Sequence, residues 1–431
     1  MRLAGYLSGS TSARLIAFTL LYVAQGVPIG LLSIALPAWL VSQGLGAADI
    51  ATLVAITGLP WGFKLVAGPF MDRFSFLPMG RRRPWVMIAQ GGLTLAMGAM
   101  AFVTEPADHL GVLIAIGFAI NAFAAFQDVA VDGMAIDLLP ETERGRANAF
   151  MAFGQVAGFS AFGALNGVLL VQFGLPLTAL ISACAVAAVF VFITLVRERH
   201  GERLLPWTRG EASPRDMEVP GSFVEIFRDL LRVLFLPMSL VLVGVEFLGR
   251  ASAGVAVSIF PVMAVQELGF TTEEYSYWIG IAAGASAVVG LAFGPLVDRF
   301  GAVRLMMVGL VTAALVAVGF ALAQAHWDDA LVVIAALLAS QFASQLMFVA
   351  VIAAFMEICW PKVAATQFAI YMSLANLSRS IGAGAFALIA DQVTTVQALY
   401  LMAGVLACGA VLLTRFNGSS HRARLAGLQQ A

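Results

Sequence analysis

Six ionisable side chains stand inside the long apolar stretches of this sequence. They are Lys64, Asp128, Asp132, Glu246, Arg250 and Arg379. On insertion scales, each charge costs about 2.5–3.5 kcal/mol at the centre of a bilayer, so six isolated charges would cost more than a typical domain gains by folding. We therefore expect these groups to pair with one another or to face a watery cavity. Both arrangements are typical of proteins that move ions or charged solutes through a membrane.

The two aspartates have the spacing of a proton-binding site beside a cation. Asp128 and Asp132 are four residues apart, so they share one face of a helix. Lys64 lies eight residues before Asp72, about 12 Å along a helix, and Asp132 lies at a similar depth in its own span. One ammonium cannot neutralise two carboxylates, so one aspartate can carry a proton. The pattern predicts proton coupling by Lys64, Asp128 and Asp132, and a static ion pair that clamps two helices is the alternative.

A second charged group carries an excess of positive charge. Glu246 and Arg250 are also four residues apart. They form either an ion pair that shields itself or an anion site, in which Glu246 acts as a further coupling group and neutralises Arg250 when no solute is bound. Because guanidinium groups hold anions through two parallel hydrogen bonds, we predict that Arg250 and Arg379 bind an anionic solute. The alternative for Arg379 is hydrogen bonding to the carbonyls of a broken neighbouring helix.

Neutral polar residues in the same stretches are weaker candidates for the solute site. Gln25 stands beside Gly26 and Pro28, and a proline inside a helix removes one backbone hydrogen bond and kinks the helix. The freed carbonyls and the Gln25 amide can then face a cavity. The other candidates are Gln155, Asn166, Gln341, Gln345 and Asn376. Each of them can equally well hold two helices together.

Charged residues at the ends of the apolar stretches form two similar groups, which we interpret as a gate. The first group is Asp72, Arg73, Arg81, Arg82, Arg83 and Asp137, and the second group is Asp298, Arg299 and Glu357. Such ion pairs can hold one end of a transport path closed in one state and must break in the other. For the arginines, the alternative is that they only determine the orientation of the chain in the membrane.

The composition predicts that membrane-spanning helices position these residues. Of the 431 residues, 61% are hydrophobic and 11% are charged, whereas a soluble domain is roughly 45–50% apolar and about 25% charged. This excludes a soluble enzyme, a nucleic-acid-binding protein and a disordered chain, and the apolar runs are too continuous for the strands of a barrel. At about 20 residues for each span, we predict an all-α integral membrane protein with twelve transmembrane helices. The predicted spans are 15–41, 48–71, 84–103, 110–138, 143–171, 176–197, 236–265, 273–297, 303–324, 330–358, 362–390 and 395–415.

The sequence predicts no cofactor, no metal and no catalytic centre. Cys184, Cys359 and Cys408 are scattered in apolar runs, and the four histidines stand alone, so neither type has metal-ligand spacing. HExxH, GxSxG and phosphate-binding-loop motifs are missing, so we expect no enzyme and expect an ion gradient as the energy source. An intramembrane prenyltransferase is the rival class, but Asp128 and Asp132 lack the second Asp-rich motif that holds magnesium in such enzymes.

The distribution of basic residues predicts the orientation of the chain. Apart from Lys64, Arg250 and Arg379, all of the 24 Lys and Arg residues fall in the termini or in loops on one side, and the six opposite loops carry none. By the positive-inside rule, both termini are cytoplasmic.

The chain divides into two similar halves. Residues 68–74 and 294–300 are identical at five of seven positions and stand at the same point of each half. Six helices in each half is an even number, so the two halves have parallel topology. We predict an N-terminal six-helix bundle at 1–197, a cytoplasmic linker at 198–235, a C-terminal six-helix bundle at 236–416 and a cytoplasmic tail at 417–431.

The linker contains one amphipathic segment. Its apolar residues at helical spacing are Phe223, Ile226, Phe227, Leu230, Leu231 and Leu234, and the charged residues on the other side are Glu225, Arg228, Asp229 and Arg232. We predict a helix at the cytoplasmic membrane interface, and a solvated linker with one helical turn is the alternative.

Short motifs in both halves resemble those of a known family. Residues 68–73 followed by 80–83 resemble the signature of the major facilitator superfamily, and this resemblance covers essentially the whole chain. A narrower set of motifs resembles the muropeptide permeases (AmpG-like) and the related acetyl-CoA transporters. It comprises residues 25–28, 63–64, 71–73, 80–83, 127–132, 137–140, 143–145 and 365–369, with Arg379. The resemblance implies two pseudo-symmetric six-helix bundles around a central cavity, in the inner membrane of a bacterium.

At two places the sequence departs from the muropeptide permeases. Their seventh helix has a basic residue followed four positions later by an acidic one, whereas here Glu246 precedes Arg250. Their tenth helix carries a glutamate, where this chain has Ser340, Gln341 and Phe342. Both helices line the cavity in this fold, so the departures favour a divergent branch.

The resemblance and the charges together predict a proton-coupled importer of an amphiphilic, anionic organic solute, with a muropeptide-like solute as the first choice. The expected partners are this solute, protons and the lipid bilayer, with no nucleic acid, and a monomer is expected. One alternative is a siderophore or another small molecule as the solute. The other is a membrane assembly factor that shares the fold and transports nothing.

Overall fold

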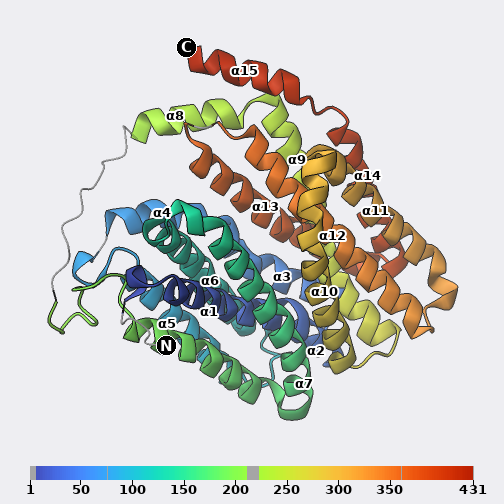
Figure 1. Ribbon diagram of the computed structural model, residues 1–431. Coiled ribbons are helices and arrows are strands. Elements are labelled where there is room, and N and C mark those ends of the chain that lie inside the picture. Colours follow the sequence, from blue (N-terminus) through green and yellow to red (C-terminus); the bar gives the residue numbers. More distant parts are fainter. Residues whose placement is uncertain (1–5, 75, 211–222, 361, 431) are drawn as a thin grey trace. The chain divides into compact units, whose positions relative to one another are not determined.

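The computed structural model describes residues 6–74, 76–210, 223–360 and 362–430 (Figure 1). Within this part of the chain every regular element is a helix, apart from an isolated bridge between Tyr6 and Arg197. Long apolar runs favour helices in lipid, because a helix satisfies all of its backbone N–H and C=O groups within one segment. The prediction of an all-α membrane fold is confirmed.

The helices form two compact units, and each unit takes a short segment from the other half of the sequence. Unit 1 comprises Met1–Leu45, Ile56–Asp216 and Ala264–Gly284, and unit 2 comprises Gly46–Ala55, Met217–Met263 and Ala285–Ala431. Each unit is described separately below.

Most of unit 1 comes from the N-terminal half of the chain. Its helices are α1 (Thr11–Gly30), α2 (Leu36–Ser42), α3 (Ala47–Gly62), α4 (Lys64–Arg73), α5 (Arg83–Met100), α6 (Leu110–Leu138) and α7 (Glu141–Leu195). A π-helical turn, Leu31–Ala35, joins α1 to α2 a few residues after Pro28, where the missing N–H loosens the helical ladder. The apolar core of the unit includes Phe18, Leu21 and Met134, which join α1 to α6.

Unit 2 contains the later helices. They are α8 (Phe223–Leu234), α9 (Pro237–Val262), α10 (Thr272–Phe300), α11 (Ala302–Leu322), α12 (Ala330–Ile358), α13 (Ala364–Ala387), α14 (Thr395–Leu413) and α15 (Gly418–Gln430). The first part of α10 belongs to unit 1, and the first part of α3 belongs to unit 2. As in α1, a proline near the end of α9, Pro261, is followed by a π-helical turn, Met263–Glu267.

Each predicted span corresponds to one helix, to a broken helix or to part of a long one. The span predicted at 330–358 coincides with α12. The spans predicted at 143–171 and 176–197 run together as α7, within which Gly174 has a φ of 71° and breaks the helical geometry. Among the described residues, seven helices are long and apolar enough to cross a membrane, or eight if bent α10 counts as one span. At 55 residues, α7 is long enough for two spans.

The second span is broken just before its charged residue, which the sequence analysis did not anticipate. The prediction was one helix over 48–71, but Phe63 has φ −96° and ψ 3° and separates α3 from α4. Pro60 in the last turn of α3 cannot donate a backbone hydrogen bond, which weakens the ladder at this point. Lys64 is therefore the first residue of α4.

The corresponding helix of unit 2 is bent at the equivalent position. In α10 the axis turns by 48° between Gly290 and Ala292. Counted from the repeated motif at 68–74 and 294–300, Gly290 is the equivalent of Lys64. The two halves therefore share a break in their second helix, but only the first half places a charge there.

A close crossing of α1 and α7 holds unit 1 together. A Cβ on Gly26 would strike the carbonyl oxygen of Gln155, and a Cβ on Gly158 would strike that of Val23. Glycine is required at such points because the two backbones leave no room for a side chain. The crossing brings the side chains around Gln155 close to those of α1.

The crossing of α9 and α13 in unit 2 uses the same arrangement. A Cβ on Gly254 would strike the carbonyl oxygen of Arg379, and a Cβ on Gly382 would strike that of Ala251. Gly382 follows Arg379 by three residues, as Gly158 follows the residue Gln155 in unit 1. The two crossings are therefore equivalent, and Arg379 stands at the position of Gln155.

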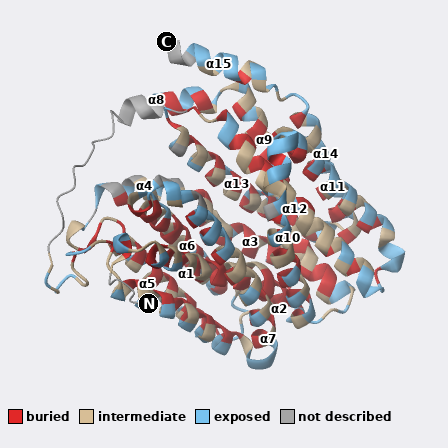
Figure 2. Ribbon diagram, viewed as in Figure 1, coloured by how far each residue is buried: buried red, intermediate tan, exposed pale blue. Residues whose placement is uncertain are grey.

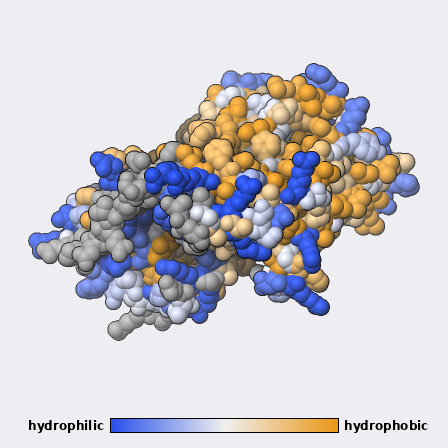
Figure 3. All heavy atoms as spheres, turned by 90° about the horizontal axis from the view of Figure 1, so that it is seen from above, coloured by the Kyte–Doolittle hydropathy of each residue, from blue (hydrophilic) through white to orange (hydrophobic). Residues whose placement is uncertain are grey.

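Many large apolar side chains are exposed on the helices. Leu95 on α5 is 75% exposed and Phe102, just after this helix, is 84% exposed. Figure 2 shows exposed and buried residues along the same helices, and Figure 3 shows apolar residues over much of the visible face. Large exposed apolar surfaces are typical of proteins that lie in lipid.

Candidate functional site

A network of buried polar side chains surrounds Asp128 in unit 1. Lys64 Nζ donates a hydrogen bond to Asp128 Oδ2 at 2.8 Å, and Gln25 Nε2 donates to Asp128 Oδ1 at 2.9 Å. Gln155 Nε2 in turn donates to Gln25 Oε1. Asp128 is 6% exposed, so its charge is compensated by one cation and one amide inside the protein.

Asp132 has different surroundings although it is only one helical turn away. Its Oδ1 accepts a hydrogen bond of 2.5 Å from the Tyr22 hydroxyl, and the residue is exposed. In the described residues no cation lies within ion-pair distance of its carboxylate. Of the two pairings that the sequence left open for Lys64, the structure contains the one with Asp128.

Three local features bring these side chains together. The break at Phe63 places Lys64 at the start of α4, where its amine lies 5.9 Å from the ring centroid of Trp61. The α-helical period puts Asp128 and Asp132 on one face of α6. The same period puts Tyr22 near Gln25 on α1, three residues away, and this spacing is the signal by which the sequence could have indicated Tyr22.

The charged group of unit 2 centres on Arg250. Arg250 Nε donates to Glu246 Oε1 at 2.7 Å, and the guanidinium lies 5.1 Å from the ring centroid of Phe348. Glu246 is 3% exposed, whereas a quarter of the Arg250 side chain is exposed. The half-buried Arg379 lies within electrostatic reach of Arg250. Two guanidinium groups thus lie in the neighbourhood of the Glu246 carboxylate.

The neutral candidates of unit 2 lie on α12 and α13. Gln341, Gln345 and Asn376 are half-buried, and the side-chain amide of none of the three has a hydrogen-bond partner among the described residues. Gln345 packs against Gly290 at the bend of α10. A Cβ added to Gly290 would lie 2.7 Å from the Nε2 atom of Gln345. Their amides are therefore available to a solute. Asn166, a weaker candidate of unit 1, instead accepts a hydrogen bond from Ser182 at 2.9 Å.

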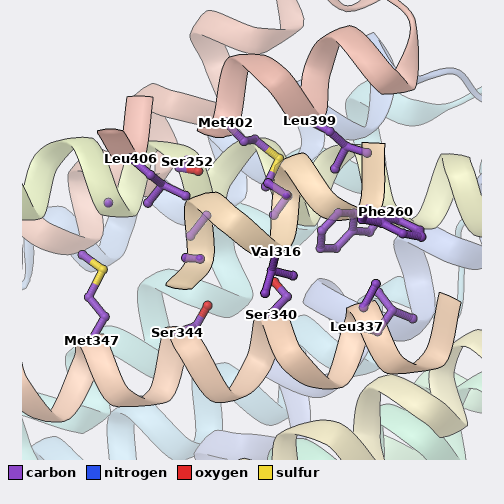
Figure 4. A pocket seen from close by; sticks show the side chains of 17 residues that line it. Ser252, Phe260, Val316, Leu337, Ser340, Ser344, Met347, Leu399, Met402 and Leu406 are labelled. Carbon is purple, nitrogen blue, oxygen red and sulfur yellow. The ribbon is translucent and has the colours of Figure 1, made fainter. Parts of the chain in front are cut away.

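A separate cavity lies inside unit 2 between α9, α11, α12 and α14 (Figure 4). It has a volume of about 60 Å³ and is lined mainly by aliphatic, methionine and phenylalanine side chains. Its polar groups are the hydroxyls of Ser252, Ser340 and Ser344, which leaves room for a few water molecules. None of the solute-site candidates is among its lining residues, and the sequence analysis did not indicate this cavity.

The arginines of the first gate group have two different environments. Arg81 and Arg82 lie 3.6 Å and 3.5 Å from the carboxylate oxygens of Asp137. Arg83 is fully buried and donates hydrogen bonds to backbone carbonyls, including that of Ile193 at 3.0 Å. Asp137 is therefore the ion-pair partner of the first two arginines, whereas Arg83 holds the end of α7.

Glu198 was missed by the sequence analysis. Its carboxylate accepts hydrogen bonds from the backbone N–H groups of Arg81, Arg82 and Arg83, at 2.9, 2.6 and 2.5 Å. These N–H groups stand at the start of α5, where a carboxylate is favourable because the helix end presents free donors. Glu198 lies more than 100 residues away in sequence, so no local pattern could reveal it.

The second gate group is not assembled in the same way. Asp298, Arg299 and Glu357 are all exposed, and within the described part of unit 2 none of them forms an ion pair. Arg299 instead lies 5.3 Å from the ring centroid of Phe300. In the first group, Arg73 is exposed at the end of α4, and the side chain of Asp72 lies outside the described residues.

Unit 1 also contains a polar contact that the sequence did not indicate. The Gln266 side chain donates hydrogen bonds to the carbonyls of Val41 and Leu45, at 3.1 and 3.0 Å. Nearby, the Thr272 hydroxyl donates to the carbonyl of Ala38 at 3.4 Å. These bonds tie the turn Met263–Glu267 and the first residue of α10 to α2 and to Leu45, which follows it. No cluster of three potential metal ligands occurs among the described residues.

Comparisons of the sequence agree with the fold. The anhydromuropeptide permease of Escherichia coli (strain K12) is 33% identical over 142 residues, which are 33% of this chain and only 28% of that protein. A putative transporter, AmpG 3, of Rickettsia prowazekii (strain Madrid E) is 25% identical over 389 residues, 85% of this chain and 87% of that protein.

Solved structures with the same fold include the nucleoside transporter NupG, with a TM-score of 0.69 and 12% identity over 94% of this chain and 98% of that one. A bacterial homolog of the human lysosomal transporter Spinster, in an inward-facing and unoccupied conformation, has a TM-score of 0.66 and 14% identity over 95% and 97%. At such identity the likeness concerns the fold alone. The family model described as Major Facilitator Superfamily matches residues 18–383 and 242–430, so the chain belongs to the Major Facilitator Superfamily of transporters.

Proposed function

We propose that this transporter imports an amphiphilic, anionic organic solute together with protons, and that the solute is muropeptide-like. The proposal is supported above all by the different partners of the two aspartates of α6, since Asp128 is paired with Lys64 and Asp132 is not. The relatives named anhydromuropeptide permease and AmpG support the choice of solute.

In this proposal Asp132 carries the proton and Asp128 stays ionised. Asp128 has a cation and an amide donor at 2.8 and 2.9 Å, so both of its carboxylate oxygens already have partners inside the protein. Asp132 is exposed and has the Tyr22 hydroxyl as its hydrogen-bond donor. A group that must load and release a proton needs access to water and no permanent cation, and Asp132 meets both conditions.

Arg250 and Arg379 are proposed to hold the anionic group of the solute. Glu246 is buried against Arg250 and partly neutralises it when the site is empty. Phe348 beside Arg250 offers an apolar surface to an amphiphilic solute, and Gln341, Gln345 and Asn376 offer neutral donors. Gln25 of unit 1 is proposed as a further residue that binds the solute, and its amide donates a hydrogen bond to Asp128.

The membrane potential explains why anion import requires a coupled proton. Moving one negative charge into a cell with a negative interior costs about 2.3 kcal/mol at 100 mV. A proton carried on Asp132 in the same cycle cancels this cost. The gate in this proposal is formed by Asp72, Arg73, Arg81, Arg82, Arg83 and Asp137, with Asp298, Arg299 and Glu357 in the second half.

The remaining expectations belong to the same proposal. The protein works as a monomer in the inner membrane, with both termini cytoplasmic, without a cofactor and without catalysing a reaction. A siderophore is the second candidate for the solute, favoured by the order of Glu246 and Arg250. A membrane assembly factor without transport activity is the alternative from another class.

Proteoliposomes with an imposed proton gradient test the proposal. The parent protein should accumulate a labelled anhydromuropeptide against its gradient, and Asp132→Asn should abolish accumulation but retain exchange of solute without a gradient. Asp128→Asn combined with Lys64→Met, which removes the ion pair as a unit, should retain some accumulation. If Asp132→Asn still accumulates solute, the assignment of the proton is wrong. If the parent protein moves neither muropeptide nor siderophore, the assembly-factor hypothesis is favoured.

A further inference from the structure

The helix α8 uses one face to pack against the end of unit 2. Leu230 and Val233 are buried in a cluster with Trp360 and Val363, which lie between α12 and α13, and with Leu425 of α15. A helix is therefore present where the sequence predicted an amphipathic one, and its described residues Leu230 and Val233 pack against protein. The side chains of Phe223, Glu225, Ile226 and Phe227 lie outside the described residues. The face that carries Leu230 and Val233 cannot be the one that meets lipid.

Asp229 does not lie on the solvent side, as the sequence pattern indicated. It is 2% exposed, and its carboxylate lies 2.7 Å from Lys362 Nζ and 3.6 Å from Arg232. The Lys362 ammonium, 2.7 Å away, holds the pKa of Asp229 below its ordinary value, so the carboxylate is ionised and paired. Its burial leaves the exposed side of α8 without a described acidic residue.

The exposed side of α8 combines arginines with large apolar residues. Arg228, Leu231 and Arg232 are exposed at helical spacing, and Phe235 directly follows the helix on the same side. Leu231 is 39% exposed and Phe235 is 67% exposed. We call these four residues the Arg228 face. The side chains of Leu231 and Phe235 are thus only partly covered by the described part of unit 2.

A second short helix lies at the same end of unit 2, as Figure 1 shows. The buried His421 of α15 makes a hydrogen bond of 2.9 Å through Nε2 to the carbonyl of Ile358, the last residue of α12. Arg422 and Arg424 of α15 and the nearby Arg415 are exposed. The end of unit 2 thus carries five exposed arginines on α8, on α15 and before α15.

We propose that the Arg228 face is a binding surface for the headgroups of anionic phospholipids, with Leu231 and Phe235 inserted at the level of the acyl chains. Arginine beside exposed apolar residues is the composition of helices that lie in the membrane interface. A soluble protein partner fits less well, because the charges of this face that the structure describes, Arg228 and Arg232, are both positive and the neighbouring Asp229 carboxylate is already paired. This surface anchors the linker between the halves to the membrane, and it is independent of the transported solute.

Lipid add-back to the purified full-length protein tests the proposal. After removal of bound lipid in detergent, the protein is titrated with phosphatidylglycerol or phosphatidylcholine, and bound lipid is counted by native mass spectrometry. Arg228→Gln with Arg232→Gln should weaken binding of phosphatidylglycerol about fivefold for each arginine and leave phosphatidylcholine unchanged. Arg304→Gln, an exposed arginine at the start of α11, is the matched control and should change neither. Lys362 keeps Asp229 paired in the variant, so the fold should be retained.

A second test measures how deeply position 231 lies in the bilayer. It does not depend on the lipid affinity of the arginine variants. In a chain without Cys184, Cys359 and Cys408, a spin label is attached through Leu231→Cys in vesicles that contain phosphatidylglycerol. The label should be shielded from an aqueous nickel reagent and accessible to oxygen. The control label, through Ala423→Cys on the exposed side of α15, should remain accessible to nickel. Equal nickel access at both sites, or loss of both lipids alike in the arginine variant, would overturn the proposal.

Discussion

The α1–α7 crossing of unit 1 and the α9–α13 crossing of unit 2 share their glycine positions but differ in their side chains. Tyr22 stands four residues before the crossing glycine of α1, as Arg250 does in α9, and Gln155 is replaced by Arg379. In unit 1 the crossing places a phenol and amides beside two carboxylates, whereas unit 2 places two guanidinium groups there. The comparison teaches that the backbone of the repeat is retained while the charge is free to diverge, since function depends on the side chains mounted on a fold.

The break in the second helix of each half extends this comparison. Unit 1 places Lys64 at the break, and unit 2 places Gly290 there, so the two halves differ in charge at a second equivalent position. The resulting asymmetry, with carboxylates in one half and an excess of arginine in the other, is what separates the proposed proton site from the proposed anion site.

The largest effect is expected from a change at Lys64, where unit 1 carries a charge that the equivalent position of unit 2 lacks. Lys64→Met should lower the free energy of unfolding by about 3–5 kcal/mol, because it leaves the buried carboxylate of Asp128 without its cation. Adding Asp128→Asn should restore most of this loss, since no uncompensated charge remains. Thermal unfolding of the detergent-solubilised protein measures both variants. If the double variant is no more stable than the single one, the two residues do not act as a pair.

The next largest effect is expected on solute affinity, and it should differ between the side chains of the two crossings. Arg250→Gln or Arg379→Gln should weaken binding of an anionic solute about 10- to 150-fold, the range expected for losing charge-assisted hydrogen bonds. The equivalent changes in unit 1, Tyr22→Phe and Gln155→Ala, should change solute affinity far less, and Tyr22→Phe should reduce proton-driven accumulation. Solute binding by calorimetry and uptake in proteoliposomes separate these outcomes. Equal losses of affinity in both units would contradict the division of roles.

A smaller effect tests whether the two backbones are equivalent. Gly26→Ala and Gly254→Ala should each destabilise the protein by about 1–3 kcal/mol, because the added methyl group meets a backbone carbonyl in both units. Gly98→Ala on α5 is the control. A Cβ there meets nothing within 4 Å, so the change should stabilise by about 0.5–1 kcal/mol. A large loss in one crossing and none in the other would disprove the equivalence.

The smallest expected effect concerns the docking of α15 in unit 2, which involves the buried residue His421. Burial lowers the pKa of His421 below its ordinary value, so the neutral ring is favoured when α15 is docked. Because the undocked histidine takes up a proton more readily, docking is strongest above about pH 6.5 and weakens as the pH falls below that value. Hydrogen exchange of α15 measured at pH 7.5 and 5.5, with each rate divided by the intrinsic rate of an unprotected amide at the same pH, should show less protection at the lower pH.

Two variants control this measurement. His421→Gln should make the protection of α15, relative to the intrinsic exchange rate, nearly independent of pH, because the titrating group is gone. His326→Gln changes an exposed histidine elsewhere in unit 2 and should leave the pH dependence as it is. A pH dependence that survives in His421→Gln would show that another group controls the docking of α15.

The sequence alone determined where most helices lie and one ion pair within a helix. The apolar runs predicted the helices because a bilayer requires about 20 apolar residues for each span, and the match of α12 to 330–358 illustrates this. The pair of Glu246 and Arg250 was predictable because a spacing of four residues is adjacency on a helix. The repeated motif likewise predicted the two equivalent halves.

Only the tertiary structure decided which groups meet across helices. Asp128 and Asp132 are equal in sequence, but the break at Phe63 and the crossing of α1 with α7 give the cation to one and Tyr22 to the other. Glu198 reaches the start of α5, and Asp229 is buried against Lys362, from positions that no local period relates. The physical reason is that periodicity specifies which side of a helix a residue occupies, whereas the partner on that side depends on the rotation, breaks and crossing of other helices.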